Sequence, residues 1–271
     1  MVKLRKHNIF NVSLAAIKMA VFWILIIFQI PIIFLLPKGK LSVGYMSFFM
    51  RLLMLVTGVR IKVHGKLSKK RPLLVVSNHI SVFELAAFSI AFGGSFFGKK
   101  EVEKFPIVGQ IAKKFGVIFL DRRPTHALEA LGDFKKELAK VNYPMSIFPE
   151  GTTTNGSYVK PFKSTLFSFI ENSDITVQPV VMVYKYQNGE NIDDLTLAEH
   201  FAYFDNKKQD MGPMCSRERS AFGQVFHVMM LGGFKIEMTV LPPPQCAGMT
   251  RKEIAAMLQK IVSDKYKEFR K

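Results

Sequence analysis

"PLLVVSNHISVFELAAFSIAF", residues 72–92, contains the transition that decides the fold. Its first part, PLLVVSN, is a short apolar run of Leu and Val that ends in Ser and Asn, which predicts a buried strand. From about Val82 to Phe92 the chain favours a helix, and Ser81 is well placed to cap it. A buried strand that leads into a helix across a short polar turn is typical of α/β proteins.

The same alternation continues on both sides of this stretch. Apolar runs predict further strands at RIKVHG (60–65), SFFGKK (95–100), GVIFLDRR (116–123), PMSIFPEG (144–151), TVQPVVMVY (176–184) and FKIEMTVLPP (234–243). Helices are predicted at FPIVGQIAKKF (105–115), THALEALGDFKKELAKV (125–141), KSTLFSFIEN (163–172) and RKEIAAMLQKIVSDKYKEF (251–269). Residues 187–215 are polar and irregular and predict a loop-rich insertion. We therefore expect an α/β fold, with a mixed and largely buried sheet flanked by helices.

The N-terminal part of the chain has a different character. The run MAVFWILIIFQIPIIFLL, residues 19–36, is interrupted only by Gln29 and Pro31. As a helix it would be about 27 Å long, close to the hydrocarbon thickness of a bilayer. PKGK follows it, in place of the small-residue cleavage site of a secretory signal. These features predict an apolar membrane-anchoring helical segment at the N-terminus.

A second apolar stretch, residues 43–59, is interrupted by Arg51. It fits the second arm of a membrane hairpin, an interfacial helix beside one span, or an ordinary core helix, and periodicity does not choose among these. Basic residues flank the first run on both sides, so charge predicts no orientation. We assign residues 1–58 to the anchoring helices and residues 59–271 to the α/β domain.

The charge balance indicates an anionic partner. The chain of 271 residues has 38 Lys and Arg against 21 Asp and Glu, a formal net charge of +17. Nucleic acid, anionic lipid and a phosphorylated substrate all fit such a charge. Lysines are spread along the whole chain and do not alternate with aromatic residues on one strand, which argues against nucleic-acid binding. The two cysteines lie in unrelated contexts, so neither a zinc site nor a disulfide framework is indicated.

Polar clusters follow three of the predicted strands. They are Asn78 with His79, the run 121–123 (DRR), and Glu150 with Gly151. Active sites of α/β sheets gather at the carboxyl ends of strands. The sequence therefore predicts that these three clusters meet in one pocket.

His79 and Glu84 have two interpretations. Positions five apart in a continuous helix point about 140° away from each other, so the two side chains meet only if the chain turns before the helix. Ser81 and Glu84 have the spacing of a capping box, which explains both residues and leaves His79 without a role. Alternatively, Glu84 accepts a hydrogen bond from one imidazole nitrogen and leaves the other free as a base.

The segment FPEGTTTNG (148–156), followed by KPFKSTLF (160–167), predicts a polar pocket with a positive rim. Glu150 would accept a hydrogen bond from a substrate hydroxyl or would hold the turn, and Lys160 and Lys163 supply the charge. A well-bonded β-turn without a ligand explains the same residues equally well. Arg122 presents a guanidinium suited to phosphate, although an exposed loop arginine is the simpler interpretation.

Four motifs taken in order carry a family resemblance: NHISVFE, FLDR, FPEGT and VQPV, all within residues 60–245. In this respect the chain resembles the glycerolipid O-acyltransferases typified by 1-acylglycerol-3-phosphate acyltransferase. The resemblance implies that His79 removes a proton from a lysolipid hydroxyl while Glu84 orients it. The hydroxyl oxygen would then attack the thioester of acyl-CoA or acyl carrier protein directly, with no metal and no cofactor.

The same resemblance implies the other roles. Arg122 would bind acceptor phosphate, Pro179 would line the acyl channel, and the remaining substrate-binding residues would be Asn78, Glu150, Gly151, Thr152 and Lys163. The implied partners are a lysolipid acceptor, acyl-CoA or acyl carrier protein, and an anionic membrane surface, with no nucleic acid. The N-terminal segment would form a two-helix hairpin that holds the enzyme in the membrane, with the catalytic domain on the cytoplasmic face of the inner membrane.

The chain departs from the family pattern at two positions, one in the catalytic pair and one that concerns the acceptor. Glu84 stands where the family usually has Asp, and Thr153 stands where it usually has a phosphate-binding Arg. The segment 148–167 is more similar to a bacterial subgroup that includes lyso-ornithine lipid acyltransferases, whose acceptor has no phosphate. We keep lysophosphatidate as the first candidate acceptor and lyso-ornithine lipid as the alternative. A non-catalytic lipid-binding protein is the rival of another class, and a serine hydrolase lacks its G-x-S-x-G motif here.

Overall fold

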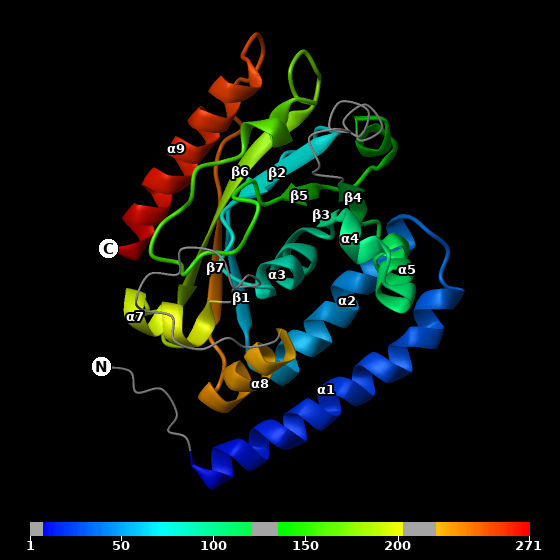
Figure 1. Ribbon diagram of the computed structural model, residues 1–271, viewed down its shortest axis with the longest axis vertical. Coiled ribbons are helices and arrows are strands. Elements are labelled where there is room, and N and C mark those ends of the chain that lie inside the picture. Colours follow the sequence, from blue (N-terminus) through cyan, green and yellow to red (C-terminus); the bar gives the residue numbers. More distant parts are fainter. Residues whose placement is uncertain (1–7, 121–134, 203–220) are drawn as a thin grey trace.

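The computed structural model describes residues 8–120, 135–202 and 221–271, which contain one central sheet with helices packed around it (Figure 1). The sheet has seven strands in the order β1-β7-β6-β2-β5-β3-β4. All neighbouring strands are parallel except β6 and β7, which are antiparallel. The strands are β1 (Arg60–His64), β2 (Leu73–Ser77), β3 (Ser95–Lys99), β4 (Ile118–Leu120), β5 (Met145–Ile147), β6 (Thr176–Lys185) and β7 (Lys235–Val240). The predicted mixed α/β sheet is thus confirmed.

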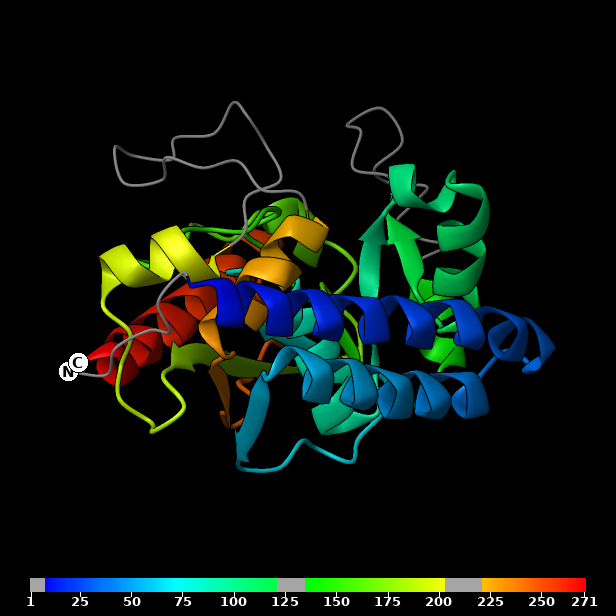
Figure 2. The ribbon, with the colours of Figure 1, turned by 90° about the horizontal axis from the view of Figure 1, so that it is seen from below.

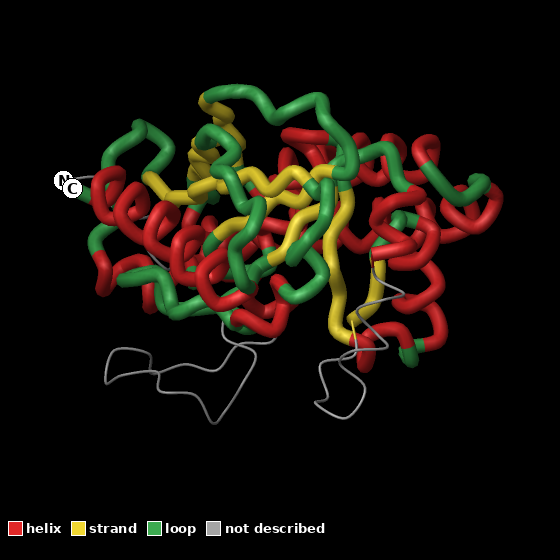
Figure 3. Tube along the Cα trace, turned by 90° about the horizontal axis from the view of Figure 1, so that it is seen from above, coloured by secondary structure: helices red, strands yellow, loops and turns green. Residues whose placement is uncertain are grey.

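Helices cover both faces of this sheet, as Figure 3 shows from above. Helix α9 (Arg251–Arg270) packs along β6 on one face, and α3 (Phe83–Phe92) lies on the other. Every residue of β2 is buried, because β5 and β6 pair with its two edges and helices cover its two faces. This environment explains why LLVVS is continuously apolar and does not alternate.

Two long helices precede the sheet. They are α1 (Ile9–Leu35) and α2 (Lys40–Thr57), which run side by side as a hairpin (Figure 2). Both are long and apolar enough to cross a membrane, judged by length and composition. Few residues of α1 are buried, and large side chains such as Phe10, Ile24 and Phe28 are exposed. An exposed apolar surface of this extent marks a contact with a membrane or another protein.

Helix α2 joins the core of the α/β part. Its buried residues Val43, Phe49 and Leu53 belong to the same hydrophobic cluster as β2 and α3. The change of character at residues 58 and 59 is therefore a boundary in the sequence, while the hydrophobic core runs across it.

One predicted helix is wrong in its type. Residues 163–172 contain only the 3₁₀ turn η2 (Ser164–Phe167), and the segment continues with i→i+3 bonds, such as Ile170 N–H to Phe167 O at 3.0 Å. The buried Phe167 and Ile170 are three residues apart. The α-helix and the 3₁₀ helix both place residues three apart on one side. The apolar spacing therefore predicted the buried face but did not distinguish the two helix types.

Several short elements were not anticipated. Helix α4 (Lys100–Glu103) precedes α5 (Pro106–Lys114), and the insertion at 187–215 contains α7 (Asp194–Thr196) and the π-helical turn η3 (Leu197–Phe201). Helix α8 (Ala221–Leu231) packs against α1 and had no counterpart in the predicted elements. Residues 203–215 of the insertion and 125–134 of the predicted helix lie outside the described residues.

Candidate active site

His79 lies just past the carboxyl end of β2, next to the end of the parallel neighbour β5. Its ring stacks on Phe148, with ring centroids 4.3 Å apart and an interplanar angle of 21°. The side chain of His79 is 18% exposed, so the ring is held from one side and still open to a cavity. The expected convergence of strand ends is therefore present for the segments that follow β2 and β5.

Glu84 is within hydrogen-bonding distance of His79. The Oε2 atom of Glu84 lies 2.7 Å from Nδ1 of His79, and Glu84 is completely buried. The chain turns at Ile80 and Ser81 before α3 begins, which is the geometry that the sequence required for this pair to meet. Glu84 also accepts from the main-chain N–H groups of Ile80 at 3.0 Å and Ser81 at 2.9 Å.

The predicted cap is corrected in detail. Helix α3 begins at Phe83 and its N-cap is Val82, not Ser81. Ser81 Oγ accepts from the N–H of Phe83 at 3.1 Å, two residues on, while Glu84 reaches back to the N–H of Ser81. Half of the capping-box pattern is thus present, and the same carboxylate serves both the helix start and the histidine.

Tyr184 is a further partner that the sequence did not reveal. Its hydroxyl donates to Oε1 of Glu84 at 2.6 Å and lies 2.7 Å from Ser81 Oγ. Burial, together with the nearby Glu84 carboxylate, raises the pKa of Tyr184 well above its usual value. Tyr184 comes from β6, and no local pattern links it to the helix start.

The donors around Glu84 determine how His79 is held. Main-chain N–H groups and a tyrosine hydroxyl all donate to the carboxylate, which is the environment of an ionised acceptor. The Nδ1 atom of His79 then carries the proton of the 2.7 Å contact. In that tautomer Nε2 is the ring nitrogen with a free lone pair.

Glu150 holds the main chain of His79. Its Oε1 accepts from the N–H of His79 at 2.6 Å, and its Oε2 accepts from the N–H of Lys160 at 2.8 Å. Thr154 completes the clamp, because its N–H donates to the carbonyl of His79 at 2.9 Å. Burial raises the pKa of Glu150 to about 8, although the two main-chain donors act in the opposite direction. Of the two roles considered for Glu150, the structure supports the one that holds the turn.

Gly151 and Lys163 lie against each other beside this clamp. Gly151 has φ of +75°, and a Cβ at this position would lie 2.5 Å from the Nζ atom of Lys163. Glycine thus permits both the left-handed turn and the approach of the lysine side chain. Lys163 is exposed, and its N–H donates to the carbonyl of Pro149 at 3.0 Å.

Asn78 has a different role from the substrate contact expected of it. Its side-chain amide donates to the carbonyl of Met182 at 2.8 Å and accepts from the N–H of Met182 at 2.9 Å. The residue is 2% exposed. Asn78 therefore ties the end of β2 to β6 and so supports the position of His79 from behind.

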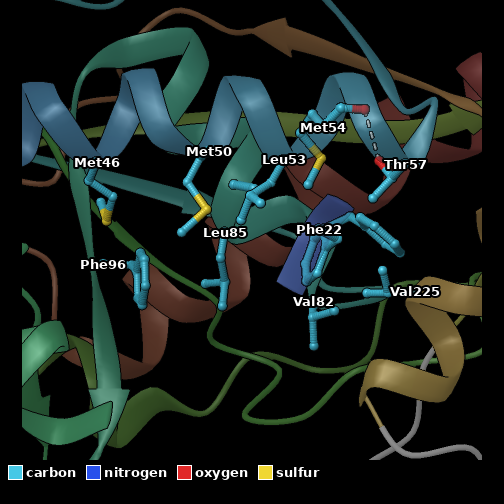
Figure 4. Close-up of a pocket in the computed structure, with 12 residues that line it drawn as sticks. Phe22, Met46, Met50, Leu53, Met54, Thr57, Val82, Leu85, Phe96 and Val225 are labelled. Carbon is cyan, nitrogen blue, oxygen red and sulfur yellow. Dashed lines mark hydrogen bonds between the residues drawn. The ribbon is translucent and has the colours of Figure 1, made fainter. Parts of the chain in front are cut away.

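Two cavities meet at the site. The first, here named the His79 cavity, has a volume of about 310 Å³, and its polar wall consists of His79, Gly151, Thr152 and Thr153. The second, the apolar pocket, has a volume of about 240 Å³ and lies between α1, α2, α3 and α8 (Figure 4). Val82, Leu85 and Phe96 line both, so the two cavities share a wall. An elongated apolar group that enters one is well placed to extend into the other.

The apolar pocket is lined almost entirely by aliphatic, aromatic and thioether side chains. Met46, Met50, Leu53 and Met54 project from α2, and Phe22 enters from α1 (Figure 4). Methionine side chains adapt their shape readily to an apolar guest. Pro179, expected in an acyl channel, is buried within β6 and lines neither of these two cavities.

Arg122 lies in the segment 121–134, outside the described residues, so its expected contact with phosphate stays a prediction. Thr152 lines the His79 cavity and Lys163 lies against Gly151, and the binding of substrate by these two residues stays a prediction. The hydroxyl of Thr153, which is 6% exposed, has no hydrogen-bond partner among the described residues. Tyr184, Thr154 and Phe148 are the partners of His79 and Glu84 that sequence reasoning missed.

Comparison with known proteins finds similarity to acyltransferases. Residues 60–183 match the model of the family described as Acyltransferase. The lyso-ornithine lipid O-acyltransferase of Brucella abortus is 32% identical over 151 residues, which cover 53% of this chain and 56% of that protein. The 1-acyl-sn-glycerol-3-phosphate acyltransferase of Neisseria gonorrhoeae is 28% identical over 117 residues, 43% of this chain and 46% of that protein. The chain thus spans about half the length of these curated relatives.

The fold is also similar to a solved structure. The crystal structure of the 1-acyl-sn-glycerophosphate acyltransferase PlsC from Thermotoga maritima superposes with a TM-score of 0.62 and 17% sequence identity, covering 93% of this chain and 95% of that chain. At this identity the similarity shows a shared fold, an α/β sheet flanked by helices. The residues that match the Acyltransferase family model, 60–183, contain His79, Glu84 and Glu150.

Proposed function

We propose that this protein is an O-acyltransferase that moves a fatty acyl chain from a thioester donor to the free hydroxyl of a lysolipid. The observation that carries the proposal is the 2.7 Å contact between His79 and the buried Glu84 at the wall of a cavity. A base held in this way, beside an apolar pocket, suits a reaction between a hydroxyl and an acyl chain. The names of the relatives point to the same chemistry.

The transfer is direct and needs no acyl-enzyme. Nε2 of His79 takes the proton of the acceptor hydroxyl as its oxygen attacks the thioester carbonyl carbon. The new C–O bond forms, the C–S bond breaks, and the thiolate leaves with the proton that His79 returns. Glu84 stabilises the imidazolium in between, while Glu150 and Thr154 hold the main chain of His79 in place. Because the thioester already has a good leaving group, positioning and one base suffice without a metal or cofactor.

The apolar pocket is the proposed site for a fatty acyl chain. It shares Val82, Leu85 and Phe96 with the His79 cavity, so a chain seated in it would present its reactive end near His79. The donor thioester would be carried by coenzyme A or by acyl carrier protein. Both are acidic, and the net charge of +17 favours the approach of either.

The first candidate acceptor is 1-acylglycerol-3-phosphate, and its product would be phosphatidic acid. The second candidate is lyso-ornithine lipid, which Thr153 favours because an uncharged hydroxyl stands where the family usually has a phosphate-binding arginine. Lys163, beside Gly151, is the described cation best placed to contact a phosphate in the first case.

We place the enzyme on a membrane, with α1 and α2 as its anchor and the α/β domain on the cytoplasmic face of the inner membrane. The exposed apolar surface of α1 would lie among lipid chains, and the basic surface would contact anionic head groups. Such a hairpin would admit a lysolipid from the bilayer plane.

Acyl transfer by the purified protein in detergent tests this function. Acyl-CoA or acyl carrier protein would be offered with lysophosphatidate or lyso-ornithine lipid in separate reactions, beside His79→Ala. We expect turnover with one acceptor and a loss of at least about 100-fold in the variant, which should remain folded by circular dichroism. Full activity of His79→Ala would remove His79 from the mechanism, and absence of turnover with every pair would favour a non-catalytic lipid-binding protein.

A further inference from the structure

Tyr184 is completely buried at the back of the site. Its side chain packs against Phe234, with ring centroids 4.5 Å apart, and lines neither the His79 cavity nor the apolar pocket. Its hydroxyl nevertheless contacts Glu84 at 2.6 Å and Ser81 at 2.7 Å. A tyrosine in this place does not touch a substrate, so any influence on a reaction would pass through Glu84.

The direction of these hydrogen bonds follows from counting protons. Tyr184 has one hydroxyl proton and donates it to Oε1 of Glu84. In the contact between Ser81 and Tyr184, Ser81 must then be the donor. Ser81 Oγ in turn accepts from the N–H of Phe83 at 3.1 Å. All three bonds therefore point the same way, from the first residue of α3 to the carboxylate.

A one-way chain of this kind has two physical consequences. Each bond polarises the next, so the last donor binds the carboxylate more strongly than an isolated hydroxyl would. The Oε1 atom is also anchored to a rigid strand, which leaves Oε2 facing Nδ1 of His79. Burial and the carboxylate raise the pKa of Tyr184, so the hydroxyl keeps its proton and remains a donor at any working pH.

We infer that Tyr184 is a positioning residue that, through the chain Phe83–Ser81–Tyr184, holds the Glu84 carboxylate in the orientation that selects the working tautomer of His79. This inference rests on the proposed acyl transfer. It assigns Tyr184 to the organisation of the base and to neither acceptor nor donor binding. An aspartate at position 84 would hold its carboxylate closer to the main chain by roughly one C–C bond, about 1.5 Å. The hydrogen bond from the Tyr184 hydroxyl would then be lost.

The test compares Tyr184→Phe with Tyr266→Phe. Tyr266 is a matched control, because it is 1% exposed and its hydroxyl donates to the carbonyl of Gly156 and not to Glu84. We expect Tyr184→Phe to lower kcat about tenfold to 100-fold, with KM for donor and acceptor within roughly twofold of the wild type. Tyr266→Phe should keep the wild-type kcat, since both variants lose a buried tyrosine hydroxyl but only that of Tyr184 contacts the carboxylate.

A double-mutant cycle with Glu84→Asp shows whether the two residues act together. In the Glu84→Asp background the carboxylate no longer reaches the Tyr184 hydroxyl. If Tyr184 acts through the carboxylate, adding Tyr184→Phe there should lower kcat less than about threefold. Equal losses in the two backgrounds would overturn the inference, as would a Tyr184→Phe enzyme with the kcat of the Tyr266→Phe control.

A readout without turnover separates this inference from the proposed function. In protein labelled with ¹⁵N-histidine, we expect Nε2 of His79 to show the resonance of an unprotonated nitrogen, and Tyr184→Phe to shift it toward a mixture of tautomers. An unchanged tautomer in Tyr184→Phe would overturn the inference. A shifted tautomer in a protein that transfers no acyl group would support the positioning role and reject the acyltransferase function.

Discussion

Two buried glutamates flank His79 and do different work. Glu84 contacts the imidazole ring, whereas Glu150 contacts the main-chain N–H of the same residue. Glu84 belongs to the first turn of the helix that follows β2, and Glu150 follows the neighbouring strand β5. The residue type is the same in both places, so the partner that each carboxylate contacts decides whether it orients the histidine ring or holds a loop.

The surroundings of the two carboxylates explain this division. Glu84 is surrounded by donors from the start of α3 and by the Tyr184 hydroxyl, which leaves one oxygen for the ring of His79. Glu150 joins two main-chain segments, at His79 and at Lys160, and leaves neither oxygen directed at the ring. A change at Glu84 should therefore act mainly on chemistry, and a change at Glu150 mainly on the loop.

Glu84→Gln should give the largest effect. The amide cannot stabilise an imidazolium as a carboxylate does, so we expect kcat to fall at least about 100-fold, with KM little changed. The measurement is steady-state acyl transfer with the acceptor that the wild type accepts, beside a thermal melt that confirms the fold. A variant that keeps activity within fivefold of the wild type would show that Glu84 only supports the helix start.

Glu150→Gln should give a smaller loss of activity, about tenfold, because His79 keeps its ring partner while its main chain loosens. Its clearer effect concerns the pH dependence of stability. The pKa of Glu150 is raised from 4.5 to about 8 in the folded protein, so folding favours the protonated form. The stability contributed by this group is complete below pH 4.5 and is lost as the pH rises through about 8.

The melting temperature of the wild type should therefore fall relative to that of Glu150→Gln between about pH 5 and pH 8, and the two curves should run parallel above that. Thermal melts of both proteins in the same detergent at several pH values measure this difference. Parallel curves over the whole range would mean that Glu150 is ionised throughout, as its two N–H donors favour.

Lys163→Ala should give the smallest effect. Its ammonium is exposed beside Gly151, where water and salt screen its charge, so we expect KM for a phosphate-bearing acceptor to rise only about threefold, with kcat unchanged. Titration of the acceptor at low and high salt checks this, because the difference should shrink as salt is added. An equal change in KM for lyso-ornithine lipid would assign the lysine to a part of the acceptor other than phosphate.

Much of the site was predictable because its residues are close in the sequence. His79 and Glu84 are separated by one turn of chain, and a helix start constrains their geometry enough to predict a contact. Glu150 was expected at the same edge of the sheet as His79, because the carboxyl ends of parallel strands lie together. The sequence left two roles open for it, a hydrogen bond to a substrate hydroxyl or a hydrogen bond that holds the turn. Only the observed N–H donors of His79 and Lys160 separate these roles.

The sequence by itself determined the seven strands, the helices α3, α5 and α9, the apolar N-terminal segment and the turn that joins His79 to Glu84, because each depends on local spacing. Tertiary structure decided that Tyr184, one hundred residues beyond Glu84, donates to it, and that Asn78 binds the main chain of Met182. It also decided that α8 and α1 close the apolar pocket. These contacts depend on which strands become neighbours in the sheet and which helices cover it, and no local pattern of residues encodes that choice.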